Sequence, residues 1–228
     1  MAAGNSVNDE IREQQAKLKD KTPKEKWEYF WHYYKWHTIG GIALIIALGN
    51  LVWTIATQKD SALSVAMVNT YLNEEVDENT MAEDFEIYAE VDQDHAEVVI
   101  DTDMHISYDA NAAATEINYA NTQKLMAMTA AASIDVILAD DAYIEHNMES
   151  GIFWDLSELL PAETLEKYAD RIKYADLPDD DKGEVPYCID VRDSKYMFSD
   201  QLSTWFCVTG NAPNIDNVVL FLDYLLAE

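Results

Sequence analysis

The sequence predicts an α/β protein with one transmembrane helix near its N-terminus. The run 38–56 contains no charged side chain, and its 19 residues come close to the roughly 20 that a helix needs to cross a bilayer core. After this run, strand-like segments alternate with helix-like segments, which indicates βαβ units and a largely parallel sheet. We therefore expect a mobile cytoplasmic tail (1–21), an aromatic interfacial helix (22–37), a transmembrane helix (38–57) and an extracytoplasmic α/β domain (60–228).

The charges on either side of the apolar run predict its orientation, because Lys and Arg next to a membrane helix mark the cytoplasmic side. Seven basic residues precede the run: Arg12, Lys17, Lys19, Lys21, Lys24, Lys26 and Lys35. Only Lys59 follows it closely. We expect a single-pass protein of the cell membrane, with a cytoplasmic N-terminus and the C-terminal domain outside. A cleaved signal peptide ending near 54–56 and a buried core helix are the rival interpretations. The length of the run favours an uncleaved signal anchor.

The segment before the apolar run is typical of a helix that lies at the membrane surface. Thr22, Pro23 and Glu25 have the order expected of a capping residue, a first-turn proline and a capping-box acid. Aromatic residues then recur at spacings of three and four, at Trp27, Phe30, Trp31 and Tyr34. Aromatic side chains of this kind settle at the lipid headgroups, so we expect contact with membrane lipid. Docking to another membrane protein is the alternative.

The outer domain is expected to contain five strands and five helices. The strands are predicted at 63–68, 96–100, 134–138, 185–191 and 204–209. The helices are predicted at 80–91, 112–132, 140–150, 161–174 and from 214 onward. The third helix is expected to end at Gly151, and the last has an apolar stripe at helical spacing.

The charge of the outer domain argues against nucleic acid as a partner. The chain has a net charge of −28, and residues 57–228 hold 8 basic against 37 acidic side chains. An acidic surface of this kind repels other anions. Acidic clusters flank the strand at 96–100 and occupy 179–181, but neither has the spacing of an EF-hand, so we expect solvated loops and no metal site.

No catalytic motif is present, so we expect a protein that is not an enzyme and carries no cofactor. Beyond the apolar run the glycines are Gly151, Gly183 and Gly210. A phosphate-binding loop, a dinucleotide fingerprint and a nucleophile elbow each need glycines at short fixed spacings, which these cannot supply.

Cys188 and Cys207 are the two cysteines of the chain, and both fall in apolar, strand-like segments. An extracytoplasmic location permits a disulfide between them. Two buried free thiols are equally compatible with the sequence.

Several segments of the outer domain resemble one lobe of a bacterial extracellular solute-binding protein, the substrate-capturing part of ABC importers. They are AAASIDVILAD at 130–140, GIFWDLSELL at 151–160, PYCIDV at 186–191 and FCVT at 206–209 with the helix that follows it. The tail motifs KEKW at 24–27 and YYKWH at 33–37 resemble those of uncharacterised membrane-anchored proteins of Gram-positive bacteria. The resemblance implies a single α/β lobe like that of a periplasmic binding protein, behind one transmembrane helix.

One feature departs from that family. Its members close two lobes around a ligand, whereas here only residues 192–203 separate the outgoing strand from the returning one, which leaves no room for a second lobe. We expect a membrane-anchored module that binds or senses a small solute. A non-catalytic scaffold or partner-binding subunit of a membrane complex is the alternative.

The candidate ligand-binding residues follow from the position of the predicted strands. Ligands of open α/β sheets bind beyond the carboxyl ends of the strands. The residues expected at such ends are Asn69, Thr70, Asp140 and Asp141. Asp190, Arg192 and Asp193 are expected at the position where two-lobed members of the family have their hinge.

Overall fold

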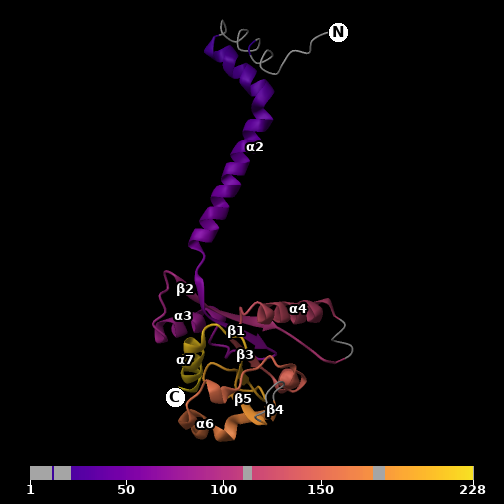
Figure 1. Ribbon diagram of the computed structural model, residues 1–228, viewed down its shortest axis with the longest axis vertical. Coiled ribbons are helices and arrows are strands. Elements are labelled where there is room, and N and C mark those ends of the chain that lie inside the picture. The colour runs from indigo at the N-terminus through magenta and orange to yellow at the C-terminus, as the bar shows by residue number, and fades with distance from the viewer. Residues whose placement is uncertain (1–11, 13–21, 110–114, 177–182, 228) are drawn as a thin grey trace. The chain divides into compact units, whose positions relative to one another are not determined.

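The computed structural model describes residues 12, 22–109, 115–176 and 183–227 (Figure 1). The chain divides into two compact units, Met1–Gln58 and Lys59–Glu228. This division falls beside the boundary expected between the transmembrane helix and the outer domain. Except for Arg12, the predicted mobile tail lies outside the described residues.

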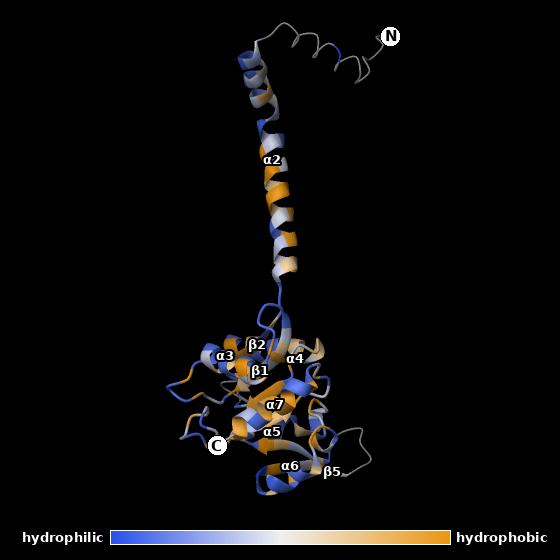
Figure 2. Cartoon of the chain, turned by 90° about the vertical axis from the view of Figure 1, so that its left-hand side faces the viewer, coloured by the Kyte–Doolittle hydropathy of each residue, from blue (hydrophilic) through white to orange (hydrophobic). Residues whose placement is uncertain are grey.

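The first unit contains one long helix, α2 (Pro23–Thr57). The backbone N–H of Glu25 donates to the Thr22 hydroxyl at 3.5 Å, and the Thr22 N–H donates to the Glu25 carboxylate at 2.8 Å, so the predicted capping box is confirmed. The part Tyr34–Thr57 is long and apolar enough to cross a membrane, judged by length and composition. Figure 2 shows apolar residues concentrated along this part of the helix.

Four aromatic residues in the first turns of α2 lie against one another. Ring centroids are 5.9 Å apart for Trp27 and Phe30, 6.2 Å for Trp27 and Trp31, and 5.6 Å for Phe30 and Tyr34. The shared face predicted from their spacing is confirmed. The segments expected to lie at the membrane surface (22–37) and across the membrane (38–57) belong to one continuous helix.

The second unit is built on a six-stranded sheet with the order β2-β1-β3-β6-β5-β4. The strands are β1 (Asp60–Val68), β2 (Ala96–Met104), β3 (Val136–Ala139), β4 (Ile172–Asp176), β5 (Glu184–Asp190) and β6 (Trp205–Val208). β1 pairs in parallel with β2 and β3, whereas the pairs β3–β6, β6–β5 and β5–β4 are antiparallel. The expectation of a largely parallel sheet was wrong, because the last three strands of the chain are antiparallel neighbours.

Helices cover both faces of this sheet. They are α3 (Glu78–Tyr88), α4 (Glu116–Ala130), α5 (Asp141–Asn147), α6 (Ala162–Lys167) and α7 (Ile215–Leu226), with short 3₁₀ turns η1 (Met148–Ser150), η2 (Leu156–Glu158) and η3 (Ala169–Arg171). The helix predicted at 161–174 is shorter than expected, and β4 takes its last residues. Gly151 has a φ of 73° after η1, which is the left-handed helix end that glycine favours.

The core has two halves, one on each face of the sheet. Alternate residues of β1 point to opposite faces, so Leu63 and Met67 belong to one half and Val68 to the other. The first half packs against α3 and α7, where the rings of Phe85 and Phe221 meet edge to face at 5.0 Å. The second half packs against α4 and α5. The unit is therefore a three-layered α/β structure whose central strands are covered on both faces.

A disulfide joins the neighbouring strands β5 and β6. Cys188 and Cys207 lie directly opposite each other in the register, with their Cα atoms 4.7 Å apart, and both are fully buried. Of the two states that the sequence left open, the structure contains the disulfide.

Candidate functional site

One edge of the sheet brings the predicted ligand-binding residues together. A single register row crosses five strands at this edge, through Met104, Val68, Ala139, Trp205 and Asp190. The carboxyl ends of β1, β2, β3 and β5 therefore meet the start of β6. The seven candidate residues lie in this row or directly beyond it.

Asn69 uses its side chain to fix the backbone at this edge. Its φ of 55° is in the left-handed region, and its amide exchanges two hydrogen bonds with the backbone of Ile106, at 2.7 and 3.0 Å. It also donates to Asp140 at 3.2 Å. Asp140 in turn accepts the N–H of Tyr143 at 2.9 Å and so caps α5. These two residues hold the start of α5 beside the segment after β2.

Thr70 and Asp190 are buried and serve the fold directly. The Thr70 hydroxyl donates to the Leu138 carbonyl at 3.1 Å. Asp190 accepts the backbone N–H of Arg192 at 3.0 Å and pairs with the Arg192 guanidinium, which raises the pKa of that guanidinium. Asp193 is more exposed and pairs with Arg171 at 3.2 Å.

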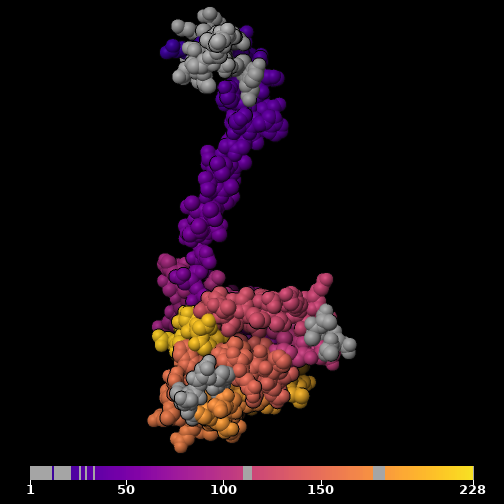
Figure 3. Space-filling view, turned by 45° about the vertical axis from the view of Figure 1, so that its right-hand side comes forward, coloured from indigo at the N-terminus to yellow at the C-terminus, as the bar shows by residue number. Residues whose placement is uncertain are grey.

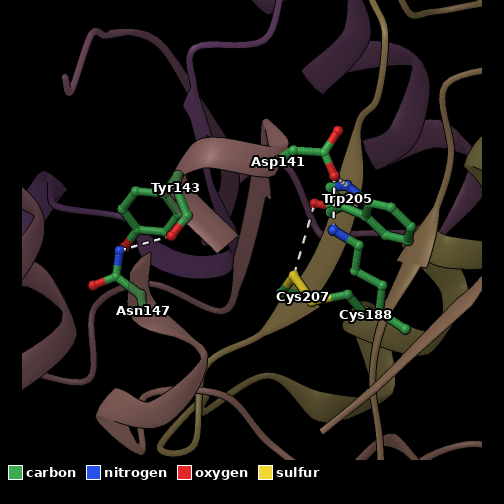
Figure 4. Close-up of a disulfide and its surroundings, with 7 residues drawn as sticks. Asp141, Tyr143, Asn147, Cys188, Trp205 and Cys207 are labelled. Atoms are coloured by element: carbon green, nitrogen blue, oxygen red, sulfur yellow. Dashed lines mark hydrogen bonds and ion pairs between the residues drawn. A yellow bond between two sulfur atoms is a disulfide. The ribbon is translucent and has the colours of Figure 1, made fainter. Parts of the chain in front are cut away.

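Asp141 is the centre of a polar cluster that joins three elements (Figure 4). Its carboxylate accepts hydrogen bonds from Lys173 of β4 at 2.7 Å, from Ser203 at 2.6 Å and from the indole of Trp205 at 2.8 Å. The Lys173 ammonium also lies 4.3 Å from the Trp205 ring centroid. Burial alone would raise the pKa of the Asp141 carboxyl, but these donors outweigh it and hold that pKa below its ordinary value.

A cavity of about 570 Å³ lies next to this edge, between α4 and α5. In the space-filling view, the parts of the chain that form α4 and α5 lie next to each other on one face (Figure 3). The apolar wall of the cavity is formed by Ile106, Leu125, Met126, Tyr143 and Ile152. Its polar groups are Tyr108, Thr122, Thr129, His146, Asn147 and Ser150. None of the described lining residues is Asp, Glu, Lys or Arg, so the described wall suits an uncharged ligand with an apolar body.

The polar side of the cavity is held rigid by contacts among its own residues. The rings of Tyr108 and His146 stack with centroids 3.7 Å apart. The Asn147 amide donates to the Tyr108 hydroxyl at 2.6 Å and to the Tyr143 carbonyl at 2.8 Å. Burial raises the pKa of the Tyr108 phenol, and the Asn147 hydrogen bond opposes this in part. The phenol therefore stays neutral near pH 7 and is available as a hydrogen-bonding group.

The cavity exists because α4 does not pack a full apolar stripe against the sheet. Leu125 is the only buried residue of this helix. Its inner side instead carries amides, since Asn118 accepts the N–H of Ser107 at 2.6 Å and Asn121 donates to the His105 carbonyl at 3.0 Å. These polar contacts hold α4 to the segment after β2 and leave space beneath its second half.

The predicted ligand residues support the cavity without lining its described wall. Asn69 fixes Ile106, and Asp140 caps the helix that carries Tyr143, His146 and Asn147. Sequence reasoning missed the lining residues themselves. The sequence did offer one signal: the predicted helix 112–132 has no continuous apolar stripe, so it was not suited to pack against the sheet along its whole length.

Among the described residues, no group of three or more His, Cys, Asp or Glu side chains is arranged to hold a metal ion. Comparisons of the chain with protein-family models, with curated proteins and with solved structures found no match.

Proposed function

We propose that Lys59–Glu228 is a non-catalytic binding or sensing module, carried outside the cell membrane by α2, and that the cavity between α4 and α5 receives its ligand. The observation that carries this proposal is the cavity itself. It is preformed, mainly apolar, and provided with a few fixed polar groups, which is the usual form of a small-molecule site. The ligand is a small uncharged molecule, with an aromatic or aliphatic body and one hydrogen-bonding group that reaches Tyr108 or Asn147.

The resemblance to a single lobe of an extracellular solute-binding protein belongs to the same proposal. Two features support it: the parallel group β2-β1-β3, and the return strand β6 with α7 after it. The connection from β5 to β6 is closed at its base by the hydrogen bond from the Val191 N–H to the Thr204 carbonyl, at 2.8 Å. A second lobe is not needed if the ligand enters beside α4.

Membrane anchorage and orientation rest on the N-terminal segment. The apolar part of α2, Tyr34–Thr57, has a length suited to a bilayer. The seven basic residues that precede the uncharged run 38–56 favour a cytoplasmic N-terminus. This arrangement would present the acidic unit to the outside.

A thermal-shift experiment on the full chain in nanodiscs of zwitterionic lipid tests the binding proposal. Indole and p-cresol, two uncharged aromatic probes, are expected to raise the melting temperature of the outer unit in proportion to their occupancy. Ala130 also lines the cavity, on the side of α4, so Ala130→Phe should fill the cavity and abolish the shift. Ala127→Phe is the matched control, because Ala127 is also exposed on α4 but is not among the residues lining the cavity.

If neither probe shifts the melting temperature of the wild type, and a wider screen of neutral solutes also fails, the binding proposal is wrong. An equal loss of the shift in both variants would also contradict it, since only one of them changes the cavity.

The second candidate function is that of a scaffold subunit, favoured by exposed apolar side chains on α4. Tyr119 and Met126 are seven residues apart on one side of the helix and are 67% and 61% exposed. Crosslinking in native membranes tests this function. A defined heteromeric partner whose crosslinks to α4 disappear in Tyr119→Ser would support the scaffold function. The absence of any crosslink between this chain and another protein would oppose it.

A further inference from the structure

The cavity between α4 and α5 contains a buried tyrosine whose hydroxyl has no partner. The Tyr143 side chain is only 4% exposed and lines the cavity. Its carbonyl accepts a hydrogen bond from Asn147 (Figure 4), but no described residue forms a hydrogen bond with its hydroxyl. The unpartnered hydroxyls of Thr204 and Tyr224 are completely enclosed by protein, whereas that of Tyr143 is not. The Tyr143 hydroxyl therefore faces open space, and the space that its side chain lines is the cavity.

Tyr108 brings a second unused hydroxyl hydrogen to the same cavity. The Asn147 amide nitrogen lies 2.8 Å from the Tyr143 carbonyl, which can only accept, so this contact fixes which end of the amide is the NH₂ group. The same NH₂ group donates to the Tyr108 hydroxyl at 2.6 Å. The Tyr108 oxygen is therefore an acceptor towards Asn147, and its own hydrogen is left for another acceptor.

The other hydroxyl groups of the described wall already use their hydrogens within the protein. Those of Thr122 and Thr129 donate to backbone carbonyls four residues earlier, at 2.8 and 2.9 Å. The Ser150 hydroxyl donates to the Asn147 carbonyl. Apart from the exposed His146 ring, the two phenols therefore carry the side-chain donors of the described wall that still lack an acceptor.

Both phenols keep their hydrogens at neutral pH. Burial raises the pKa of Tyr108 and of Tyr143, and a charge on Tyr108 would raise that of Tyr143 further, which places the two groups near each other. The described wall contains no Lys or Arg to balance an anion, and an unpaired charge is costly to bury. The group that suits this wall is an uncharged acceptor.

We propose that the cavity selects uncharged carbonyl compounds, ketones with an aromatic or aliphatic body, and that Tyr143 and Tyr108 donate hydrogen bonds to the carbonyl oxygen. This inference rests on the proposed function, because it names the class of ligand for the same cavity. A carbonyl oxygen has two lone pairs and no hydrogen, so it can accept from two donors at once. A ligand with an N–H group, such as indole, brings a further donor to a wall whose own donors are unmatched.

Isothermal titration of the full chain in zwitterionic nanodiscs tests the inference, with empty nanodiscs measuring uptake by the lipid. Three bicyclic probes of similar size are compared: 1-indanone has a carbonyl, indole has an N–H and indane has no polar group. We expect 1-indanone to bind about tenfold more tightly than indole, the effect of a net hydrogen bond to a buried donor. Indane measures the contribution of the apolar wall alone.

Tyr143→Phe is the decisive variant, because it keeps the ring and removes only the unpartnered hydroxyl. It should weaken the binding of 1-indanone by about tenfold and leave that of indane unchanged. Tyr108→Phe should weaken 1-indanone binding less, since Tyr108 is 38% exposed and water competes for its hydroxyl. Tyr187→Phe is the matched control: Tyr187 is buried on β5, does not line the cavity, and should bind all three probes as the wild type does.

The outcomes separate this inference from the proposed function. Binding of indole and indane, with 1-indanone no tighter than indole, would overturn the choice of a carbonyl ligand and leave the cavity as a binding site. Equal weakening of 1-indanone and indane by Tyr143→Phe would also overturn it, since a lost hydroxyl cannot affect a probe without polar groups. If none of the three probes binds the wild type, the inference is wrong and the proposed function is opposed as well.

Discussion

The Asp141 carboxylate accepts a hydrogen bond from the Trp205 indole at 2.8 Å and so ties the first residue of α5 to the first residue of β6. Trp205 lies opposite Ala139 in the register of β3 and β6 and opposite Asp190 in that of β5 and β6. Asp141 also reaches across to Lys173 of β4. One side chain thus links the parallel half of the sheet to its antiparallel half, close to the buried disulfide (Figure 4).

Asp141→Asn is expected to destabilise the outer unit by about 1–2 kcal/mol, because an amide cannot pair with Lys173 and accepts fewer hydrogen bonds. The loss is no larger because the Asp141 side chain is 47% exposed and solvent screens its ion pair. Thermal unfolding of the full chain measures the effect. Asp200→Asn, in an exposed turn, is the control and should leave the melting temperature nearly unchanged.

The same carboxylate predicts a dependence of stability on pH. Its pKa is lower in the folded protein than its ordinary value of 3.8, so the stability it contributes is present above that value and is lost as the pH falls through the folded pKa. The difference in melting temperature between the wild type and Asp141→Asn should therefore stay constant from pH 7 to about pH 5 and shrink below about pH 4. A difference that grows on acidification would contradict this assignment.

Much of the fold could be predicted from the sequence, because its strongest signals are local. The capping box of Thr22 and Glu25, the aromatic spacing in α2 and the left-handed turn at Gly151 each depend on residues within about one helical turn. The strand β4 could not be predicted in the same way. It lies on the sheet edge with partly exposed residues, and its position depends on pairing with β5, where Lys173 lies opposite Cys188.

The seven candidate residues were predicted to lie at one edge of the sheet, and the structure places them there, but it gives several of them structural partners. Strand ends can be read from the sequence, so the edge could be predicted. Whether a polar residue is free for a ligand depends on tertiary contacts: Thr70 is taken up by Leu138 and Asp190 by Arg192. The stacking of Tyr108 on His146 joins residues far apart in the chain, and the sequence gives no local signal for it.

Asp135 is expected to be among the most sensitive positions of the outer unit. This fully buried carboxylate accepts the Ser64 N–H at 2.8 Å and, from Asn214, the backbone N–H at 2.9 Å and the side-chain amide at 3.1 Å. Asp135→Ala would leave these donors without an acceptor and should cost about 3 kcal/mol or more. Asp135→Asn should cost less, because one oxygen remains. The order of melting temperatures, with exposed Asp94→Ala as control, checks this, and equal values for Asp135→Ala and the control would refute it.

The disulfide is expected to contribute strongly to stability. Cys188 and Cys207 are 19 residues apart, and closing a loop of this length stabilises a folded chain by about 3 kcal/mol, mainly through the unfolded state. The double variant Cys188→Ala with Cys207→Ala should therefore melt roughly 6–12 °C below the wild type, given the size of the unit. Reductant applied during unfolding should lower the wild-type melting temperature and leave that of the variant unchanged.

Because both sulfurs are fully buried, reductant added to the folded protein at 25 °C should reduce the disulfide only as fast as the outer unit opens. Rapid reduction under those conditions would show that β5 and β6 separate far more readily than their burial implies.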